Sequence, residues 1–416
     1  MTLLIRNLAQ IATPEGSDAL RGAAMRRIRI HRDAAIAVRD GRFVFAGAES
    51  DLPRDVRKGV TKEVDARRST ALPGFVDSHT HLPFAGARES EFNRRLSGET
   101  YEQIAASGGG IASTVRATRA ASEADLEALV LERSARMAAH GTTTAEAKSG
   151  YGLNFDDEMK QLRAIRAASE RSPVRLVPTC LAAHEIPPEA RGSAEAREAY
   201  LREIVERIQP AAAAQRLAAF CDAFVERGVY TRDEGERVLR AGAASGLVPR
   251  LHADELSDTG GAALAASLDA ASADHLMCVS EEGIRALAAS STIANLLPAT
   301  SLFLMSERFA PARALIEAGA AVSLSTDCNP GSSMTESMQL VVQLACLRMK
   351  MTVEEALTAA TLNGAASLRL AAATGSIERG KRADFMIVDA PSYLHLVYHF
   401  GVNLVTGVWR DGVRIV

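Results

Sequence analysis

Between residues 72 and 373, the chain alternates short apolar segments, typical of β-strands, with segments rich in Ala, Leu, Glu and Arg, typical of helices. This alternation favours a parallel sheet whose strands are connected by crossover helices. Eight candidate strands can be counted, with the sequences FVDSHTH, TTTAEAKS, RLVPTCLAAH, FCDAFV, VPRLHADE, SADHLM, TIANLLPA and AVSLSTD. Eight parallel strands close into a barrel. The segment is therefore predicted to be an α/β fold of the (β/α)8 TIM-barrel type.

Local signals in the same segment support helices between the strands. Ser122 is followed by Asp125 at the spacing of a capping box, and Gly141 follows the helical segment that ends at His140. The alternative architecture is an open doubly wound sheet. It is disfavoured because no GxGxxG fingerprint follows the first strand.

Residues 1–71 and 374–416 have a different pattern, with short β-type segments separated by turns. Asp40-Gly41 lies between two alternating apolar runs, and Asp411-Gly412 forms a similar signal near the carboxyl end. Neither end has enough strands to fold alone. The two ends are therefore predicted to combine into one small β-sandwich domain that is interrupted by the barrel of residues 72–373.

The composition limits the classes of function. The chain has 416 residues, of which 47% are apolar and 24% charged, enough for one large core and a smaller module. A net charge of -3 lacks the excess of positive charge expected of a nucleic-acid-binding protein, and no apolar run approaches the length of a membrane span. The five cysteines form no CxxC pair, and the amino terminus shows no signal peptide. We therefore expect a cytoplasmic protein whose partner is a small molecule.

Polar side chains gather at the carboxyl ends of the candidate strands, where a barrel places its chemistry. His79 and His81 follow the first strand one residue apart, and this spacing turns both imidazoles toward the same face. Such a pair alone is weak support for a metal site. Further histidines and carboxylates follow the third, fifth, sixth and eighth strands: His184, His252, Asp254, Glu255, Asp274, His275 and Asp327.

Three histidines and one carboxylate are a suitable ligand set for a hydrolytic metal ion and leave one position open for water. The predicted ligands of a single ion, either Zn²⁺ or Fe³⁺, are His79, His81, His252 and Asp327. Such an ion lowers the pKa of its water toward neutrality. The predicted catalytic residues are Glu255, His275 and Asp327. Glu255 follows the predicted ligand His252 by three residues, close enough to carry the proton of the water to a leaving nitrogen. His275 could orient the water or polarise the carbonyl group of the substrate. Which of the two residues takes the proton stays open.

Lys148, after the second candidate strand, offers an alternative to the single-metal site. In some barrel hydrolases a carboxylated lysine bridges two metal ions. That lysine would follow the fourth strand, where this chain reads FCDAFVERG and has no lysine. One metal ion is therefore favoured.

The segments LPGFVDSHTH, LHADE, DHL and STD together resemble the amidohydrolase superfamily, in which a small β-domain is likewise assembled from both termini. More narrowly, DSHTHLPFAGARESEF, SGGGI, AEAKSGYGL, LAAHEIPPE, LHADE and STDCNPGSS resemble one branch of it. That branch catalyses the third step of histidine degradation. The resemblance implies hydrolysis of the ring amide C–N bond of 4-imidazolone-5-propanoate, giving N-formimidoyl-L-glutamate.

The same resemblance implies contacts with an anionic substrate from Arg88, Tyr151, His184, Glu255, Asn329, Gly331 and Ser332. Independently of it, a propionate tail needs a planar, permanently charged donor, and Arg88 just beyond the first strand can grip it with two hydrogen bonds. Structural alternatives remain open. Arg88 can pair with Glu89 or Glu91, Tyr151 can pack within its loop, and the segment from Asn329 can be an ordinary Asx turn.

Two rival functions follow from the same residues. The first is a heterocycle aminohydrolase such as a guanine deaminase, because the metal ligands barely distinguish ring opening from deamination. The second is a barrel that binds a metabolite without catalysis. Such a protein would be expected to lack some of the metal ligands or the catalytic base, whereas this chain has all of them. The expected assembly is a homodimer, the commonest state of soluble enzymes.

Overall fold

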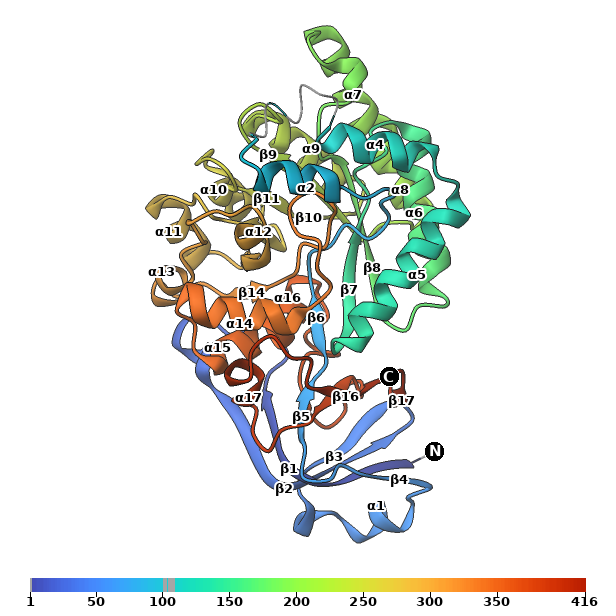
Figure 1. The fold of residues 1–416 in the computed structure, drawn as a ribbon, viewed down its shortest axis with the longest axis vertical. Helices are drawn as coiled ribbons and strands as arrows, with labels where there is room; N and C mark the ends of the chain where they lie inside the picture. Colours follow the sequence, from blue (N-terminus) through green and yellow to red (C-terminus); the bar gives the residue numbers. More distant parts are fainter. Residues whose placement is uncertain (1, 100–102, 104–108) are drawn as a thin grey trace.

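The computed structural model describes residues 2–99, 103 and 109–416, so Ser107 and Gly108 of the SGGGI segment lie outside the described residues. Two sheets organise the described chain. Figure 1 shows the larger, helix-covered part above, and below it a sheet that combines blue strands from the start of the chain with red strands from its end. Within the described residues, no helix combines the length and apolar character needed to cross a membrane.

The larger sheet contains the eight strands that the sequence predicts. They run in parallel and follow each other in sequence order around the sheet: β6 (Phe75–Asp77), β7 (Thr142–Lys148), β8 (Arg175–Ala183), β9 (Phe220–Val225), β11 (Leu251–Ala253), β12 (Ser272–His275), β13 (Ile293–Leu296) and β14 (Val322–Leu324). A short strand, β10 (Val248–Pro249), pairs with β9 just before β11 begins. These strands are almost entirely buried, which is expected for a sheet covered by helices. The predicted barrel is confirmed.

The barrel closes between its first and last strands through the residues that follow them. The Thr326 N–H donates to Asp77 at 3.0 Å, and the Asp327 N–H donates to the carbonyl of His79 at 3.0 Å. One step further on, the His81 N–H donates to the carbonyl of Cys328 at 3.0 Å. The segments that carry the predicted metal ligands therefore form the closing seam of the barrel.

Helices cover the barrel, and their boundaries follow local capping rules. Ser122 and Asp125 form the predicted capping box of α5, and Gly141 follows that helix with φ +96°. The α-helices are α1 (Arg54–Lys58), α2 (Glu89–Leu96), α4 (Ile111–Ala120), α5 (Glu123–Ala139), α6 (Phe155–Ser169), α7 (Ala194–Glu203), α8 (Gln209–Ala214), α9 (Arg232–Ala244), α10 (Gly261–Ser267), α11 (Glu281–Ala289), α12 (Pro298–Phe303), α13 (Ala312–Glu317), α14 (Met338–Met349), α15 (Val353–Thr358), α16 (Gly364–Ser367) and α17 (His395–Tyr398).

The smaller sheet joins the two ends of the chain. Its strand order is β17-β16-β15-β5-β1-β2-β3, with β4 paired to β1, and the strands are β1 (Thr2–Pro14), β2 (Ile28–Arg39), β3 (Arg42–Ala48), β4 (Lys62–Asp65), β5 (Thr70–Pro73), β15 (Phe385–Val388), β16 (Val405–Arg410) and β17 (Val413–Arg414). Asp40-Gly41 and Asp411-Gly412 are the predicted hairpin turns, with positive φ at all four positions.

This sheet curls over its own apolar core. The rings of Phe43 on β3 and Phe385 on β15 lie 5.9 Å apart, although β3 and β15 are not neighbours in the strand order. The Phe43 N–H also donates to the carbonyl of Lys381 at 3.0 Å. The two layers predicted as a sandwich are thus parts of one folded sheet, and the division of the chain at residues 72 and 373 stays a prediction.

Candidate active site

A cavity of about 720 Å³ opens at the carboxyl ends of the barrel strands. The predicted metal ligands His81, His252 and Asp327 line it, as do Glu255 and His275. All seven predicted substrate contacts line it as well: Arg88, Tyr151, His184, Glu255, Asn329, Gly331 and Ser332. Residues from His81 to Ser332 therefore face one space, because the strands that precede them end at the same edge of the barrel.

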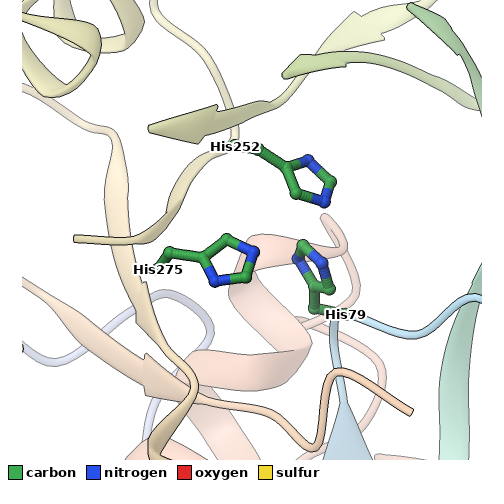
Figure 2. Close-up of side chains that lie close together, drawn as sticks. All are labelled: His79, His252 and His275. Atoms are coloured by element: carbon green, nitrogen blue, oxygen red, sulfur yellow. The ribbon is translucent and has the colours of Figure 1, made fainter. Parts of the chain in front are cut away.

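Histidine rings from three strands converge below this cavity. Figure 2 shows His79, His252 and His275 turned toward one another from the segment after β6, from β11 and from β12. The ring of His79 lies 4.5 Å from that of His252 and 5.3 Å from that of His275, centroid to centroid. The ring of His81 lies 5.3 Å from that of His79. Ligand atoms of these side chains fall into three overlapping groups, each within 4.8 Å: His79 with His252 and His275, His81 with His184 and His252, and His79 with His81 and Asp327.

Asp327 joins the two histidines of the first strand. Its Oδ1 lies 3.4 Å from Nε2 of both His79 and His81. Its Oδ2 accepts hydrogen bonds from the hydroxyls of Thr300 at 2.7 Å and Ser332 at 3.2 Å. One carboxylate oxygen is thereby fixed by the protein, and the other faces the histidines.

Two carboxylates outside the predicted site hold the other sides of the rings. The Nδ1 of His79 lies 2.9 Å from Oδ2 of Asp274, and the Nδ1 of His252 lies 3.0 Å from Oδ2 of Asp222. Asp274 precedes His275 in the sequence, but it pairs with His79. In both pairs the Nδ1 atom faces a carboxylate, which leaves the Nε2 atom to bind a ligand.

Burial keeps two of the proposed ligand histidines neutral. It lowers the pKa of His79 to about 3, helped by the nearby charge of Lys148, and the pKa of His81 to about 4. Burial also disfavours charge on His252, but the Asp222 carboxylate outweighs it and raises the pKa of this ring. A neutral imidazole is the form that binds metal ions, and a metal competes with the proton at such nitrogens.

The residues present fit a metal ion. Within the described part of the chain, the buried Nε2 atoms of His252 and His275 have no hydrogen-bond partner. Buried polar atoms are rarely left without a partner, so each such atom calls for an explanation. Imidazole nitrogens together with the Asp327 carboxylate are a donor set typical of hydrolytic zinc or iron sites.

Glu255 and His275 stand together beside this cluster. The Nδ1 of His275 lies 3.6 Å from Oε1 of Glu255. Burial raises the pKa of Glu255, although its neighbour His275 opposes the effect. The backbone at His275 has φ +77°, a strained conformation of the kind that clusters at functional sites. A carboxyl group with a raised pKa holds a proton more readily, which suits it to take up and return one.

Arg88 lies at the wall of the cavity. Its Nε donates to Glu91 at 2.8 Å, as one alternative from the sequence had it. Its Nη1 passes so close to the backbone of Gly331 that a β-carbon on that residue would lie 2.3 Å away. Arg88 thus pairs with Glu91 and lines the cavity at the same time.

Tyr151 and His184 form one wall of the cavity, with their rings 5.2 Å apart. Asn329 plays a structural role. Its Oδ1 accepts hydrogen bonds from the N–H groups of Gly331 at 2.8 Å and Ser332 at 2.9 Å. These bonds form the Asx turn that the sequence analysis named as an alternative. This turn holds Ser332 against Asp327.

Several buried residues at the site were missed from the sequence. Asp222, Glu146 and Arg250 were not assigned, and Lys148 was considered only as a possible metal bridge. All four are fully buried among the barrel strands. The signal that could have found them is a charged residue within an apolar strand, because a buried charge requires a partner. Thr300 carried no comparable signal.

The barrel, the polar cluster at the carboxyl ends of its strands and the metal-type donor set define a hydrolase of the amidohydrolase class. The model of the amidohydrolase family matches residues 231–415. Solved structures share the fold: an adenosine deaminase from Xanthomonas campestris with bound zinc has a TM-score of 0.71 at 20% identity, covering 99% of this chain and 92% of that one. A guanine deaminase from C. acetobutylicum has a TM-score of 0.68 at 15% identity, covering both chains fully.

Much higher identity connects the chain with three imidazolonepropionases. The protein from Symbiobacterium thermophilum is 48% identical over 416 residues, covering 100% of this chain and 97% of its own. Those from Porphyromonas gingivalis and Myxococcus xanthus are both 47% identical, covering 99% and 100% of this chain and 97% and 98% of their own. The chain belongs to the imidazolonepropionase family.

Proposed function

We propose that this protein hydrolyses the ring amide C–N bond of 4-imidazolone-5-propanoate to give N-formimidoyl-L-glutamate, the third step of histidine degradation. The observation that carries the proposal is that Arg88 and the cluster of histidines with Asp327 line the same cavity. Arg88 offers a bidentate donor for a propionate, and the cluster offers hydrolytic chemistry. The family of the chain supports the same substrate.

One metal ion, Zn²⁺ or Fe³⁺, would be held by His79, His81, His252 and Asp327. When bound, the ion supplies Lewis acidity that activates water for attack on the ring carbonyl. The donor set suits either metal.

Glu255 then carries out the proton transfers. Its carboxylate takes a proton from the attacking water as the oxygen bonds to the ring carbonyl carbon. The C–N bond of the ring breaks, and the same proton passes from Glu255 to the leaving ring nitrogen. The second proton of the water leaves the new carboxyl group for solvent, and the resulting carboxylate and the freed nitrogen are those of N-formimidoyl-L-glutamate. His275, 3.6 Å from Glu255, orients the water or polarises the carbonyl group of the substrate. Asp327, which would also hold the metal ion, is the third proposed catalytic residue.

The remaining wall of the cavity would hold the substrate. Arg88 would bind the propionate, Tyr151 would offer its hydroxyl as a donor, and His184 would contact the ring or carbonyl. The polar turn of Asn329, Gly331 and Ser332 would close the other side. The Nδ1 of His184 is engaged with the carbonyl of Gly150 at 2.9 Å, so its Nε2 is the ring nitrogen left to contact the substrate.

The decisive experiment compares 4-imidazolone-5-propanoate and guanine as substrates of the same purified preparation, with metal content measured in parallel. We expect ring opening of the imidazolone, about one zinc or iron per chain, and no deamination of guanine. Deamination of guanine with no ring opening would instead support the aminohydrolase alternative. A preparation that folds, binds the imidazolone and turns over neither compound would point to a binding protein.

We also propose a homodimer in the cytoplasm. The described cysteines are all free, as expected in a reducing compartment. For the dimer, exposed apolar side chains on and after α17 and on α14, two helices in contact with each other, support an interface: Tyr398 is 82% exposed, Phe400 68% and Leu347 61%. Phe400→Asp should convert the dimer to monomer in light scattering, while Val413→Asp on β17, at a side chain that is also exposed, should not. A wild-type monomer would refute the assembly.

A further inference from the structure

A layer of charged side chains lies buried beneath the histidine cluster. It contains three carboxylates and two cations, all with no exposed surface: Glu146, Lys148, Asp222, Arg250 and Asp274. They come from β7, β9 and β12 and from the residue that precedes β11. Nothing in the proposed hydrolysis uses the cations of this layer.

One half of the layer leads from His79 to Glu146. Asp274 Oδ2 lies 2.9 Å from His79 Nδ1 and 3.5 Å from an Nη of Arg250. The Nε of Arg250 lies 3.1 Å from Glu146 Oε1. Arg250 also donates to the backbone carbonyls of Ser78 at 2.7 Å and Ser367 at 2.9 Å, which fixes its position.

The other half leads from Glu146 to His252. The Nζ of Lys148 lies 2.9 Å from Glu146 Oε2 and 2.7 Å from Asp222 Oδ2. Asp222 Oδ2 in turn lies 3.0 Å from His252 Nδ1. His79 and His252 are therefore the two ends of one continuous chain of alternating charges.

This arrangement is poorly explained as a device for stability. Buried ion pairs seldom add net stability, because the loss of hydration offsets their attraction, whereas removal of one partner is strongly destabilising. A carboxylate that orients a ligating histidine is common, and the ring needs that carboxylate to stay in place. Here each such carboxylate is itself held by a buried cation, and both cations share Glu146.

We propose that Lys148 is a positioning residue for the metal ligands: with Glu146 and Arg250, it fixes Asp222 and Asp274 so that His252 and His79 present their Nε2 atoms together. This inference rests on the proposed metal site. Lys148 touches neither metal nor substrate in this scheme and acts through the carboxylates.

The test measures metal affinity and ligand geometry, with or without turnover. Metal is removed from wild type and Lys148→Met, and Co²⁺ is titrated back against a chelator while its visible absorption is recorded. Loss of partners behind a ligating histidine typically weakens metal affinity by about 10- to 100-fold. We expect a loss of this size in Lys148→Met, and a changed Co²⁺ spectrum even at saturation.

Arg175→Met is the matched control. Arg175 pairs with Asp384 at 2.7 Å and Asp411 at 2.8 Å at the opposite end of the barrel, so its removal also takes a cation from two carboxylates, of which Asp384 is fully buried. This variant should lose stability and keep wild-type Co²⁺ affinity and spectrum. Equal effects in both variants would mean that Lys148 contributes only to stability, and the proposal would be overturned.

A second variant pair tests whether the layer acts as one unit. If it does, adding Asp222→Asn to Lys148→Met weakens Co²⁺ binding less than about threefold further, whereas independent contributions multiply. Should Lys148→Met fail to fold, Glu146→Gln, which keeps the shape of the side chain, is measured in its place, and wild-type affinity there overturns the proposal. Wild type that binds no metal refutes the proposed function, whereas wild type and variants that bind equally refute only the layer.

Discussion

Replacement of Arg88 by Met tests the proposed substrate most directly. The side chain is 15% exposed, and its Nε is already used by Glu91, so the Nη groups remain for the propionate. A hydrogen bond to a charged group contributes about 1.5–3 kcal/mol. Two such bonds to the propionate, reduced by the nearby negative charge of Glu91, leave roughly 3 kcal/mol, which corresponds to about a 10²-fold loss of kcat/KM.

The assay is steady-state ring opening of 4-imidazolone-5-propanoate, with the parent imidazolone that lacks the propionate as a second substrate. Arg88→Met should lose about two orders of magnitude on the first and little on the second. The double variant Arg88→Met/Glu91→Gln should recover part of the loss, because an unpaired Glu91 carboxylate would otherwise repel the propionate. A folded Arg88→Met protein with less than about a threefold change on the propanoate would refute the reasoning.

Three further predictions concern the base, the metal and the turn. Glu255→Gln should lower kcat by about 10²- to 10⁴-fold while metal stays bound. Burial raises the pKa of Glu255, and a general base acts in its deprotonated form. Wild-type activity should therefore fall on acidification at a pH above the ordinary pKa range of a glutamate. If Glu255→Gln kept the same loss of activity at acidic pH, the assignment of Glu255 as the base would be contradicted. Chelation should abolish turnover and lower Tm, since metal at 100-fold its Kd adds about 2.7 kcal/mol; an unchanged Tm would contradict a metal in the fold. In Gly331→Ala, the new β-carbon, 2.3 Å from Arg88 Nη1, should displace that guanidinium and raise KM more than it lowers kcat; an unchanged KM would contradict the assigned contact.

The barrel was predictable because each of its strands is an apolar run bounded by helical segments. A fully buried parallel strand such as FCDAFV needs little long-range information to be recognised. The turns at Asp40 and Asp411 were predictable for a similar reason, since Asp-Gly favours positive φ at both positions. The curl that brings Phe43 to Phe385 depends on how the whole sheet twists, and no local pattern encodes it.

The polar ends of the strands were predictable as a group, but their pairings were not. His79 and Asp274 are 195 residues apart, and only the geometry of the closed barrel decides that Asp274 meets His79 and leaves the adjacent His275 for Glu255. The same applies to Asp222, which faces both His252 and Lys148. Sequence spacing can indicate that a strand ends in a cavity, whereas the partner of a buried charge is a property of neighbouring strands.

The closing seam explains why the proposed ligands sit where they do. β6 and β14 are the two ends of the strand order, and they meet through hydrogen bonds from Asp327 to His79 and from His81 to Cys328. These backbone contacts fix how far apart the backbones of His79, His81 and Asp327 lie, whichever rotamers their side chains adopt. A barrel that failed to close would therefore also separate its ligands, so the same few hydrogen bonds serve both the fold and the proposed metal site. The His-x-His spacing alone was weak support for a metal site because the spacing says nothing about what lies across the seam, and in this chain Asp327 lies there.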